Sequence, residues 1–277
     1  IDKFDKNLSY YHQSKIEITK NRAIRNPKNI LDFGCGVGTM IPYMKKKFKK
    51  SKIYAFDESK DSLKFLKKRY PFVSCLKKIN GNIKFDLIFL SGVIHHIDRS
   101  IRKRILKKIY LSLKPKGKLI IFEHNPYNPL TNIVVKNCEF DRDAQLIKRK
   151  ELINICENVS FVVDDSAYVY FFPTSMKKFK VLEKYLEWFF LGAQYFCIFK
   201  KNESSDVAFN RAALMDKKVY KDQILKLLKA ELLYGLYRFI QLRKLKEKFG
   251  PSLKKISTIQ KLYRMFFCRG LDKGFSS

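Results

Sequence analysis

Residues 30–38 read ILDFGCGVG, a short apolar run that leads into glycines at positions 34, 36 and 38. The run predicts a buried strand, and glycine lets the turn bring its backbone close to a ligand, where a Cβ would clash. A helical pattern starts at about Thr39, so the turn opens onto a helix N-terminus, which favours an anionic group. The stretch therefore predicts a strand–turn–helix unit that binds a ligand.

An acidic residue at a suitable spacing strengthens this interpretation. Asp57 follows Gly36 by 21 residues and ends a second predicted strand, 52–56. An acidic side chain there can accept hydrogen bonds from both hydroxyls of a ribose. A nicotinamide dehydrogenase would prefer Gly-x-Gly-x-x-Gly, whereas this chain has Gly-x-Gly-x-Gly followed by Thr39. The order of the glycines disfavours a dehydrogenase.

Apolar runs and helical patterns alternate from residue 28 to residue 200, which is typical of βαβ units. The predicted strands are 29–33, 52–56, 72–76, 85–90, 118–123, 160–170 and 193–200, and the predicted helices are 39–47, 59–69, 99–113, 141–158 and 176–191. We expect an α/β fold: a Rossmann-like, seven-stranded, mostly parallel sheet with helices on both faces. The expected domains are an N-terminal helical lead-in (1–27), the sheet domain (28–201) and a basic helical tail (202–277).

Over residues 28–200 the chain resembles class I S-adenosylmethionine-dependent methyltransferases. Beside the glycine turn and Asp57, the resemblance rests on two stretches, FDLIFLSGVIHHI (85–97) and LKPKGKLIIFE (113–123). It implies S-adenosylmethionine as the cofactor. It also implies that Asp32 and the turn residues Gly34, Cys35, Gly36 and Gly38 hold the methionine part, Asp57 the ribose and Glu58 the adenine side. Ser91 and Gly92, after the fourth strand, would flank the sulfonium.

The chain departs from the family pattern after the third predicted strand. Many members carry an acidic or amide residue there to bind the adenine amine. Residues 76–82 read LKKINGN and contain no acid. Adenine recognition is then left to backbone groups, Asn80 or Asn82, and the sequence does not choose among them.

Three histidines follow predicted strands. His95 and His96 come after strand 85–90, and His124 comes after strand 118–123 in the polar stretch EHNPYNP. His96 and His124 are the candidate catalytic residues, because each can accept a proton from an acceptor group. In the alternative interpretation one of the paired histidines is packed, the other caps the next helix, and His124 orders its loop. We expect no metal site, because no acidic cluster surrounds the pair and Asp98 is alone.

Of all the expected features, the sequence determines the methyl acceptor least. Residues 123–129 and 138–144 look like those of methyltransferases from bacterial biosynthetic and surface-glycan gene clusters, which implies a small-molecule acceptor. The fourth strand ends in Ser91-Gly92 rather than Asn/Asp-Pro-Pro-Tyr, which disfavours amino-methylation of a base. We expect an oxygen acceptor. The alternatives are an RNA methyltransferase and a non-catalytic, cofactor-binding or membrane-associated partner protein.

The composition is strongly basic: 58 Lys and Arg against 26 Asp and Glu give a formal net charge of +32. Such an excess can mark a phosphate-bearing partner. Lysine is spread along the whole chain, however, and accompanies much Ile, Asn, Phe and Tyr, the composition of an AT-rich genome. A nucleic-acid partner is therefore disfavoured.

The cysteines, the hydropathy and the start of the chain bear on where in the cell the protein is found. The six cysteines form no CxxC pair, which indicates reduced thiols in a cytoplasmic protein. No apolar run is long enough to span a membrane, and the start has no signal-peptide pattern. The first residue is Ile1 instead of methionine, so we expect the natural chain to begin earlier.

The tail contains a long helical pattern at residues 216–248, with an apolar stripe. The stripe consists of Leu225, Leu228, Leu232, Leu236 and Phe239. It would have to be covered by the catalytic domain, by a second copy of the chain or by an anionic membrane surface. Peripheral membrane contact through this segment and the oligomeric state are left open by the sequence.

Overall fold

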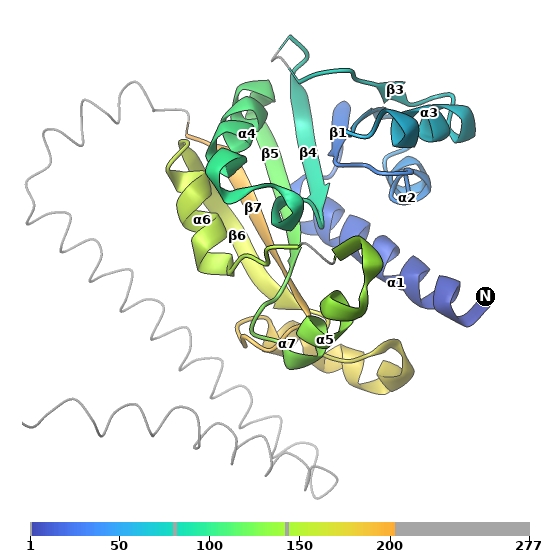
Figure 1. Ribbon diagram of the computed structural model, residues 1–277, viewed down its shortest axis with the longest axis vertical. Coiled ribbons are helices and arrows are strands. Elements are labelled where there is room, and N and C mark those ends of the chain that lie inside the picture. The colour runs from blue at the N-terminus through green and yellow to red at the C-terminus, as the bar shows by residue number, and fades with distance from the viewer. Residues whose placement is uncertain (1, 80–81, 142–143, 203–277) are drawn as a thin grey trace, which may run out of the picture. The chain divides into compact units, whose positions relative to one another are not determined.

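The computed structural model describes residues 2–79, 82–141 and 144–202, and these form one seven-stranded sheet in the order β3-β2-β1-β4-β5-β7-β6 (Figure 1). The strands are β1 Asn29–Phe33, β2 Lys52–Phe56, β3 Ser74–Cys75, β4 Phe85–Ser91, β5 Leu113–His124, β6 Phe161–Val169 and β7 Gln194–Lys201. β7 runs antiparallel to both of its neighbours, and all other pairs are parallel. The predicted Rossmann-like, mostly parallel sheet is confirmed.

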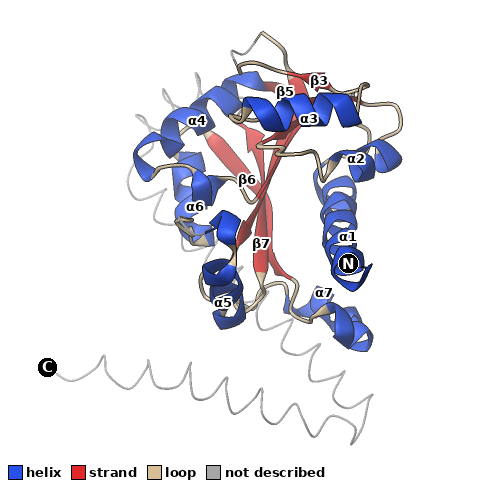
Figure 2. Ribbon diagram, turned by 45° about the vertical axis from the view of Figure 1, so that its right-hand side comes forward, coloured by secondary structure: helices blue, strands red, loops and turns tan. Residues whose placement is uncertain are grey.

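Helices cover both faces of the sheet. Figure 2 shows α4 and α6 on one face and α1 and α2 on the other. The helices are α1 Asp2–Ile18, α2 Ile41–Lys47, α3 Lys60–Arg69, α4 Arg99–Ser112, α5 Pro129–Asn137, α6 Arg149–Glu157 and α7 Glu183–Leu186. A π-helical turn, Thr19–Ala23, extends α1, and three short 3₁₀ segments, η2 Ile94–His96, η3 Glu139–Asp141 and η4 Thr174–Leu182, lie between other elements.

The central strands are buried on both faces, which explains why their sequences are apolar throughout rather than alternating. In β4, Leu87, Ile88, Phe89 and Leu90 are all fully buried. Two cores result, one on each face. Leu106 and Ile109 of α4 and Leu152 of α6 pack in one core, whereas Ile16 of α1, Met44 of α2 and Leu66 of α3 pack in the other.

Two predicted helices differ from the structure, and one observed helix was not predicted. The helix predicted for 141–158 begins only at Arg149, and the one predicted for 176–191 consists of η4 and the single turn α7. The sequence analysis did not predict α5. Its start is nevertheless a regular helix N-terminus: the Asn128 side chain accepts a hydrogen bond from the Thr131 backbone N–H, and Pro129 occupies the first turn.

The strand order places a topological switch point between β1 and β4. β2 and β3 extend the sheet on one side of this pair and β5 extends it on the other, so the chain connections diverge there. In open α/β sheets, ligands bind outside the carboxyl ends of the strands at such a switch point. The residues that follow β1 and β4 are Gly34 and Gly92, so both predicted cofactor segments lie at this switch point.

The apolar stripe of the tail, from Leu225 to Phe239, lies outside the described residues. Its role and the predicted domain boundaries stay predictions. Among the described helices, none is both long and apolar enough to cross a membrane.

Candidate active site

The glycine turn after β1 has the backbone conformation that its sequence requires. Gly34, Gly36 and Gly38 have φ values of 73°, 50° and 82°, which L side chains rarely adopt. The backbone N–H groups of Gly34 and Cys35 both donate to the Phe56 carbonyl at the end of β2. A Cβ on Gly36 would have no heavy atom within 4 Å. The turn therefore leaves open space at Gly36, which is suited to a ligand close to its backbone.

Asp57 lies directly over this turn. Its Oδ2 accepts a hydrogen bond of 2.7 Å from the Gly36 backbone N–H, and its Oδ1 accepts one of 2.9 Å from the Ser59 N–H. Each carboxylate oxygen keeps a further lone pair for a ligand hydroxyl. Glu58, the next residue, is exposed. Asn80 lies outside the described residues, so adenine recognition remains open.

Asp32, in β1, is a buried acid with an unused acceptor. Its Oδ2 is buried and has no hydrogen-bond partner. Burial, and secondarily the charge of Asp57, raises the pKa of Asp32 to about 7. A buried carboxyl group without a partner beside an open glycine turn fits a cationic ligand group such as an ammonium. The residues present thus fit the amino-acid end and the ribose of S-adenosylmethionine.

Cys35, also predicted to line the cofactor site, is buried, and its Sγ contacts the Gly36 carbonyl at 3.6 Å. Burial, together with the nearby Asp32, raises the pKa of this thiol. The thiol is therefore protonated and inert at neutral pH.

At the end of β4, Ser91 contacts a residue that the sequence analysis missed. Lys15 of α1 donates from Nζ to Ser91 Oγ at 2.8 Å, and its ammonium lies 5.7 Å from the centre of the Phe122 ring. Burial lowers the pKa of Lys15 to about 8, although the charge of Glu123 opposes the shift. No sequence signal distinguishes this lysine, because it is one of many in a very basic chain. Its position is set by the packing of α1 on the sheet.

The three histidines form a continuous group, which we call the histidine cluster (His95, His96 and His124). The centre of the His95 ring lies 4.2 Å from that of His96 and 5.3 Å from that of His124. The cluster adjoins the predicted sulfonium site, since a Cβ on Gly92 would lie 3.5 Å from His95 Cε1. The structure thus brings together the two predicted catalytic residues, with His95 between them.

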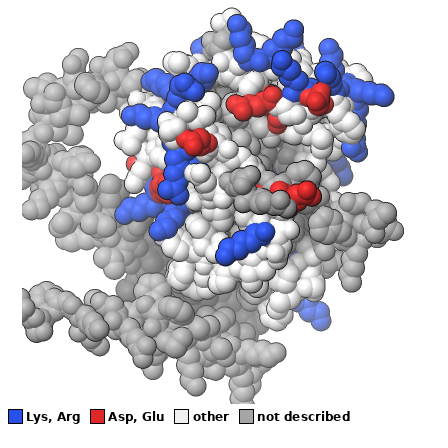
Figure 3. All heavy atoms as spheres, in the orientation of Figure 1, with Lys and Arg blue, Asp and Glu red and all other residues white. Residues whose placement is uncertain are grey.

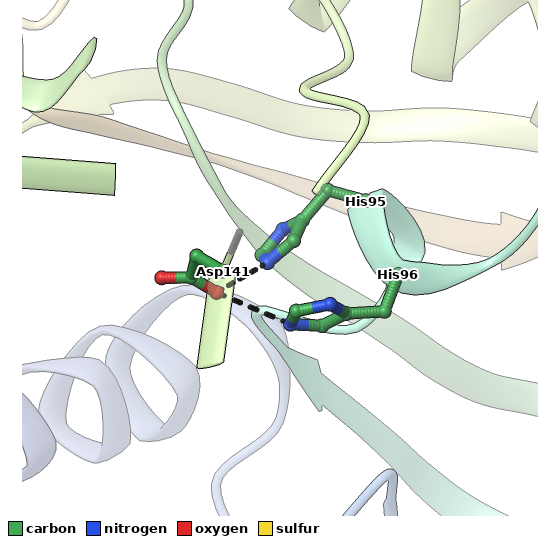
Figure 4. Close-up of side chains that lie close together, drawn as sticks. All are labelled: His95, His96 and Asp141. Carbon is green, nitrogen blue, oxygen red and sulfur yellow. Dashed lines mark hydrogen bonds and ion pairs between the residues drawn. The ribbon is translucent and has the colours of Figure 1, made fainter. Parts of the chain in front are cut away.

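Two carboxylates face the cluster. Glu123 Oε2 lies 2.5 Å from His95 Nδ1, and Glu123 Oε1 accepts hydrogen bonds from the Val93 and Ile94 N–H groups. Asp141, on η3, lies 3.4 Å from His95 Nε2 and 3.2 Å from His96 Nε2 (Figure 4). The reason given for excluding a metal, that no acids surround the pair, is therefore wrong. Asp98 instead caps α4 by accepting from the Ser100 N–H, so neither histidine is the helix cap.

The cluster carries a defined charge pattern. Burial lowers the pKa of His95, but Glu123 and Asp141 outweigh it, so the net shift is upward. Burial alone would raise the pKa of Glu123, yet its bonds to His95 and Ile94 hold it below its usual value. Burial, followed by the charges of His95 and Lys15, lowers the pKa of His124 to about 4. His124 is therefore neutral at neutral pH.

The polar loop after β5 is tied to the segment before β7. Asn125 Nδ2 donates to the carbonyls of Phe190 and Gly192, and Asn128 Nδ2 donates to that of Leu191. The Thr131 hydroxyl donates to the Ala193 carbonyl. We call these contacts the loop tie. The side chains of its asparagines donate to backbone carbonyls, which explains why the stretch after β5 is so polar.

Comparisons with known proteins agree with the fold and the turn. A family model described as a methyltransferase domain matches residues 31–119, from β1 into β5. No curated protein matches the sequence. A methyltransferase dependent on S-adenosylmethionine from Archaeoglobus fulgidus is 17% identical, with a TM-score of 0.52 over 68% of this chain and 92% of its own.

Two further solved structures differ in the acceptors named for them. An O-methyltransferase family protein from Burkholderia thailandensis is 11% identical, with a TM-score of 0.53 over 72% of this chain and 59% of its own. The N-methyltransferase NodS from Bradyrhizobium japonicum, in complex with S-adenosylhomocysteine, is 12% identical. Its TM-score is 0.50 over 70% of this chain and 87% of its own. At these identities the likeness concerns the fold, which therefore accommodates both kinds of acceptor.

The fold class and the matched domain follow from the combination of these observations. The matched methyltransferase domain contains the positive-φ glycine turn, Asp32 and Asp57, and the sheet has a single antiparallel strand, β7, beside β5. The turn leaves the space and the acceptor atoms that S-adenosylmethionine requires. Residues 31–119 match the methyltransferase-domain family, and the chain has the fold of the class I S-adenosylmethionine-dependent methyltransferases.

Proposed function

We propose that this methyltransferase acts on an oxygen atom of a small-molecule acceptor, with His124 as the residue that takes up the acceptor's proton. The observation that carries the proposal is the position of the histidine cluster beside Ser91 and Gly92. A hydroxyl acceptor must lose its proton on transfer, and His124 is neutral and can receive it, although the burial and positive charges that lower its pKa to about 4 also make it a weak base. The cofactor supplies a methyl group activated by its sulfonium.

The other residues of the site position the reactants. Gly34, Gly36 and Gly38 let the backbone approach the cofactor, and Asp57 is placed for the ribose hydroxyls. Lys15 covers the end of β4 and holds Ser91. Positioning of the acceptor oxygen in line with the methyl group and exclusion of water contribute most of the rate in such a reaction. Glu58 and Cys35 remain predicted members of the cofactor site.

The face of the molecule drawn in Figure 3 gives no support to an RNA acceptor. An RNA substrate would need a basic groove beside the methyl site. On the face drawn in Figure 3, lysine and arginine side chains stand in several separate groups, with uncharged surface between them. Membrane contact through residues 216–248 stays a prediction, because that segment lies outside the described residues.

The acceptor class can be tested directly. The purified chain is incubated with S-adenosylmethionine labelled on its methyl group and, in separate reactions, with hydroxylated small molecules, amines and total RNA. Label in an alkali-stable product of a hydroxylated compound supports the proposal. Label that enters only amines or only RNA contradicts it, and a chain that binds the cofactor but labels nothing in a broad panel supports the non-catalytic alternative.

Replacement of His124 by alanine should lower kcat by about 100-fold while the dissociation constant of S-adenosylmethionine changes less than about twofold. The side chain would face the acceptor and not the cofactor, so only the transfer step loses its proton acceptor. His12→Ala serves as the matched control, because His12 packs against Tyr43 instead of the cluster. Parallel losses of cofactor affinity and turnover would place His124 on the cofactor side.

Asp32 gives a test that depends on pH. Because its pKa is about 7, the carboxyl group is largely protonated at pH 6 in the free protein. An ammonium beside it favours the charged form, so cofactor binding at pH 6 should release a proton, and affinity should fall as the pH drops below 7. Calorimetry in two buffers with different ionisation enthalpies measures this release. Asp32→Asn should remove it, and equal heats in both buffers for the wild-type chain would refute the assignment.

A further inference from the structure

The histidine cluster has one geometric property that proton transfer to His124 does not require. One possible ligand atom from each of His95, His96 and Asp141 lies within 4.8 Å of the other two. Asp141 Oδ1 is 3.4 Å from His95 Nε2 and 3.2 Å from His96 Nε2. Around a cation with ligand bonds of about 2.1 Å, neighbouring ligand atoms stand about 3.0–3.4 Å apart. Both measured distances fit that spacing, and both rings point toward the carboxylate in Figure 4.

The two carboxylates on either side of the His95 ring are compatible with a cation at this point. Glu123 is fully buried, and its Oε2 is placed to accept the proton of His95 Nδ1. In the neutral ring this leaves a lone pair on Nε2, directed toward the Asp141 carboxylate. Two acceptor atoms that face each other repel unless a proton or a cation lies between them. A carboxylate that orients a histidine from its far nitrogen is also the usual arrangement behind a metal-ligating imidazole.

The surroundings leave a cation accessible on one side. His95 is buried, with only 1% of its side chain exposed, whereas 41% of the His96 side chain and 17% of that of Asp141 are exposed. Solvent or a ligand oxygen can therefore complete the coordination from the His96 side. Two imidazoles and one carboxylate favour a divalent transition metal over Mg²⁺ or Ca²⁺, which prefer all-oxygen sites.

We propose that His95, His96 and Asp141 bind a divalent transition-metal cation, with Glu123 as the positioning residue behind His95. This proposal concerns cation binding alone and does not depend on which acceptor is methylated. One consequence does rest on the proposed function: at the carboxyl edge beside Gly92, such a cation would hold an acceptor hydroxyl and lower its pKa. His96 is then a ligand, and proton uptake remains with His124, for which an acidified hydroxyl is a suitable partner.

Cobalt(II) is a suitable probe, because its visible absorption reports nitrogen coordination. The full chain, without an added histidine tag, is titrated with Co²⁺ in the absence of cofactor and acceptor, by absorption and by calorimetry. We expect one Co²⁺ per chain, displaced by Zn²⁺ but not by excess Mg²⁺. His96→Ala and Asp141→Asn should each weaken binding at least about tenfold, and Glu123→Gln about 10–100-fold. His12→Ala, the matched histidine control, should bind as the wild type does.

Two results would overturn the site. The first is absence of Co²⁺ and Zn²⁺ binding to the wild-type chain at about 1 mM cation, which would mean that a proton on His95 Nε2 bridges Asp141 instead. The second is equal binding by the wild-type chain, His96→Ala and Asp141→Asn. Circular dichroism checks that each variant is folded, and Asp141→Asn keeps the shape of the partly exposed side chain. Neither result affects the methyl-transfer proposal, which is tested by label transfer.

Discussion

S-adenosylmethionine should bind the Asp57→Ala variant at least about tenfold more weakly than it binds the wild-type chain. A carboxylate that accepts from both ribose hydroxyls makes two charge-assisted hydrogen bonds, each stronger than a neutral one. The variant also removes the acceptor of the Gly36 N–H, so the glycine turn loses the contact that fixes its position at the switch point. Calorimetric titration of both proteins measures the difference.

Asp61→Ala is the control for this experiment. Asp61 lies four residues further on in α3, and among the described residues its strongly exposed carboxylate pairs with Lys64. Its loss should leave the dissociation constant of the cofactor unchanged. If Asp57→Ala binds the cofactor as tightly as Asp61→Ala does, the assignment of Asp57 to the ribose is refuted.

Gly34→Ala should destabilise the fold by about 3 kcal/mol, which corresponds to about 10 °C in Tm for a domain of this size. The φ of 73° at Gly34 costs an alanine about 1 kcal/mol. In addition, the new Cβ would lie 2.6 Å and 2.8 Å from the two methyl carbons of Val93, an overlap worth about 2 kcal/mol. Thermal and denaturant unfolding of the cofactor-free protein measure the loss.

A double-mutant cycle isolates the contact. Val93→Ala removes the two methyl groups, so Gly34→Ala should cost clearly less in the Val93→Ala background than in the wild type. Simple additivity of the two changes would show that the overlap is not the cause. Gly36→Ala is the contrasting variant: with open space at its Cβ position, it should cost only about 1 kcal/mol of stability while filling the space offered to the cofactor.

The sheet could be predicted because each strand carries its own signal. β1, β2 and β4 are short apolar runs whose ends are marked by glycine or an acid, and all three lie within about one residue of their predicted bounds. The helix errors arose where polar loops resemble helix starts. The helix predicted to begin at residue 141 begins only at Arg149, and the side chain of Asp141 instead faces two histidines.

The candidate site was predictable only where it is local in sequence. The turn from Gly34 to Gly38 and Asp57 belong to one strand–helix–strand unit, so their spacing alone brings them together. The contact of Lys15 with Ser91 joins residues 76 positions apart, and that of Asp141 with His95 joins residues 46 apart. Periodicity carries no information on such pairs, because they depend on how α1 and η3 pack on the finished sheet.

The loop tie also has a consequence for the order in which the molecule assembles. Its hydrogen bonds join residues 62 to 67 positions apart, so the chain must close a long loop before any of them forms. The strand–turn–helix unit of β1 and α2, by contrast, makes its contacts within a few dozen residues. Contacts of low sequence separation form early in folding, and distant ones late. The nascent chain should therefore complete the strand–turn–helix unit of β1 and α2 first and the contacts between the β5 exit and the segment before β7 last.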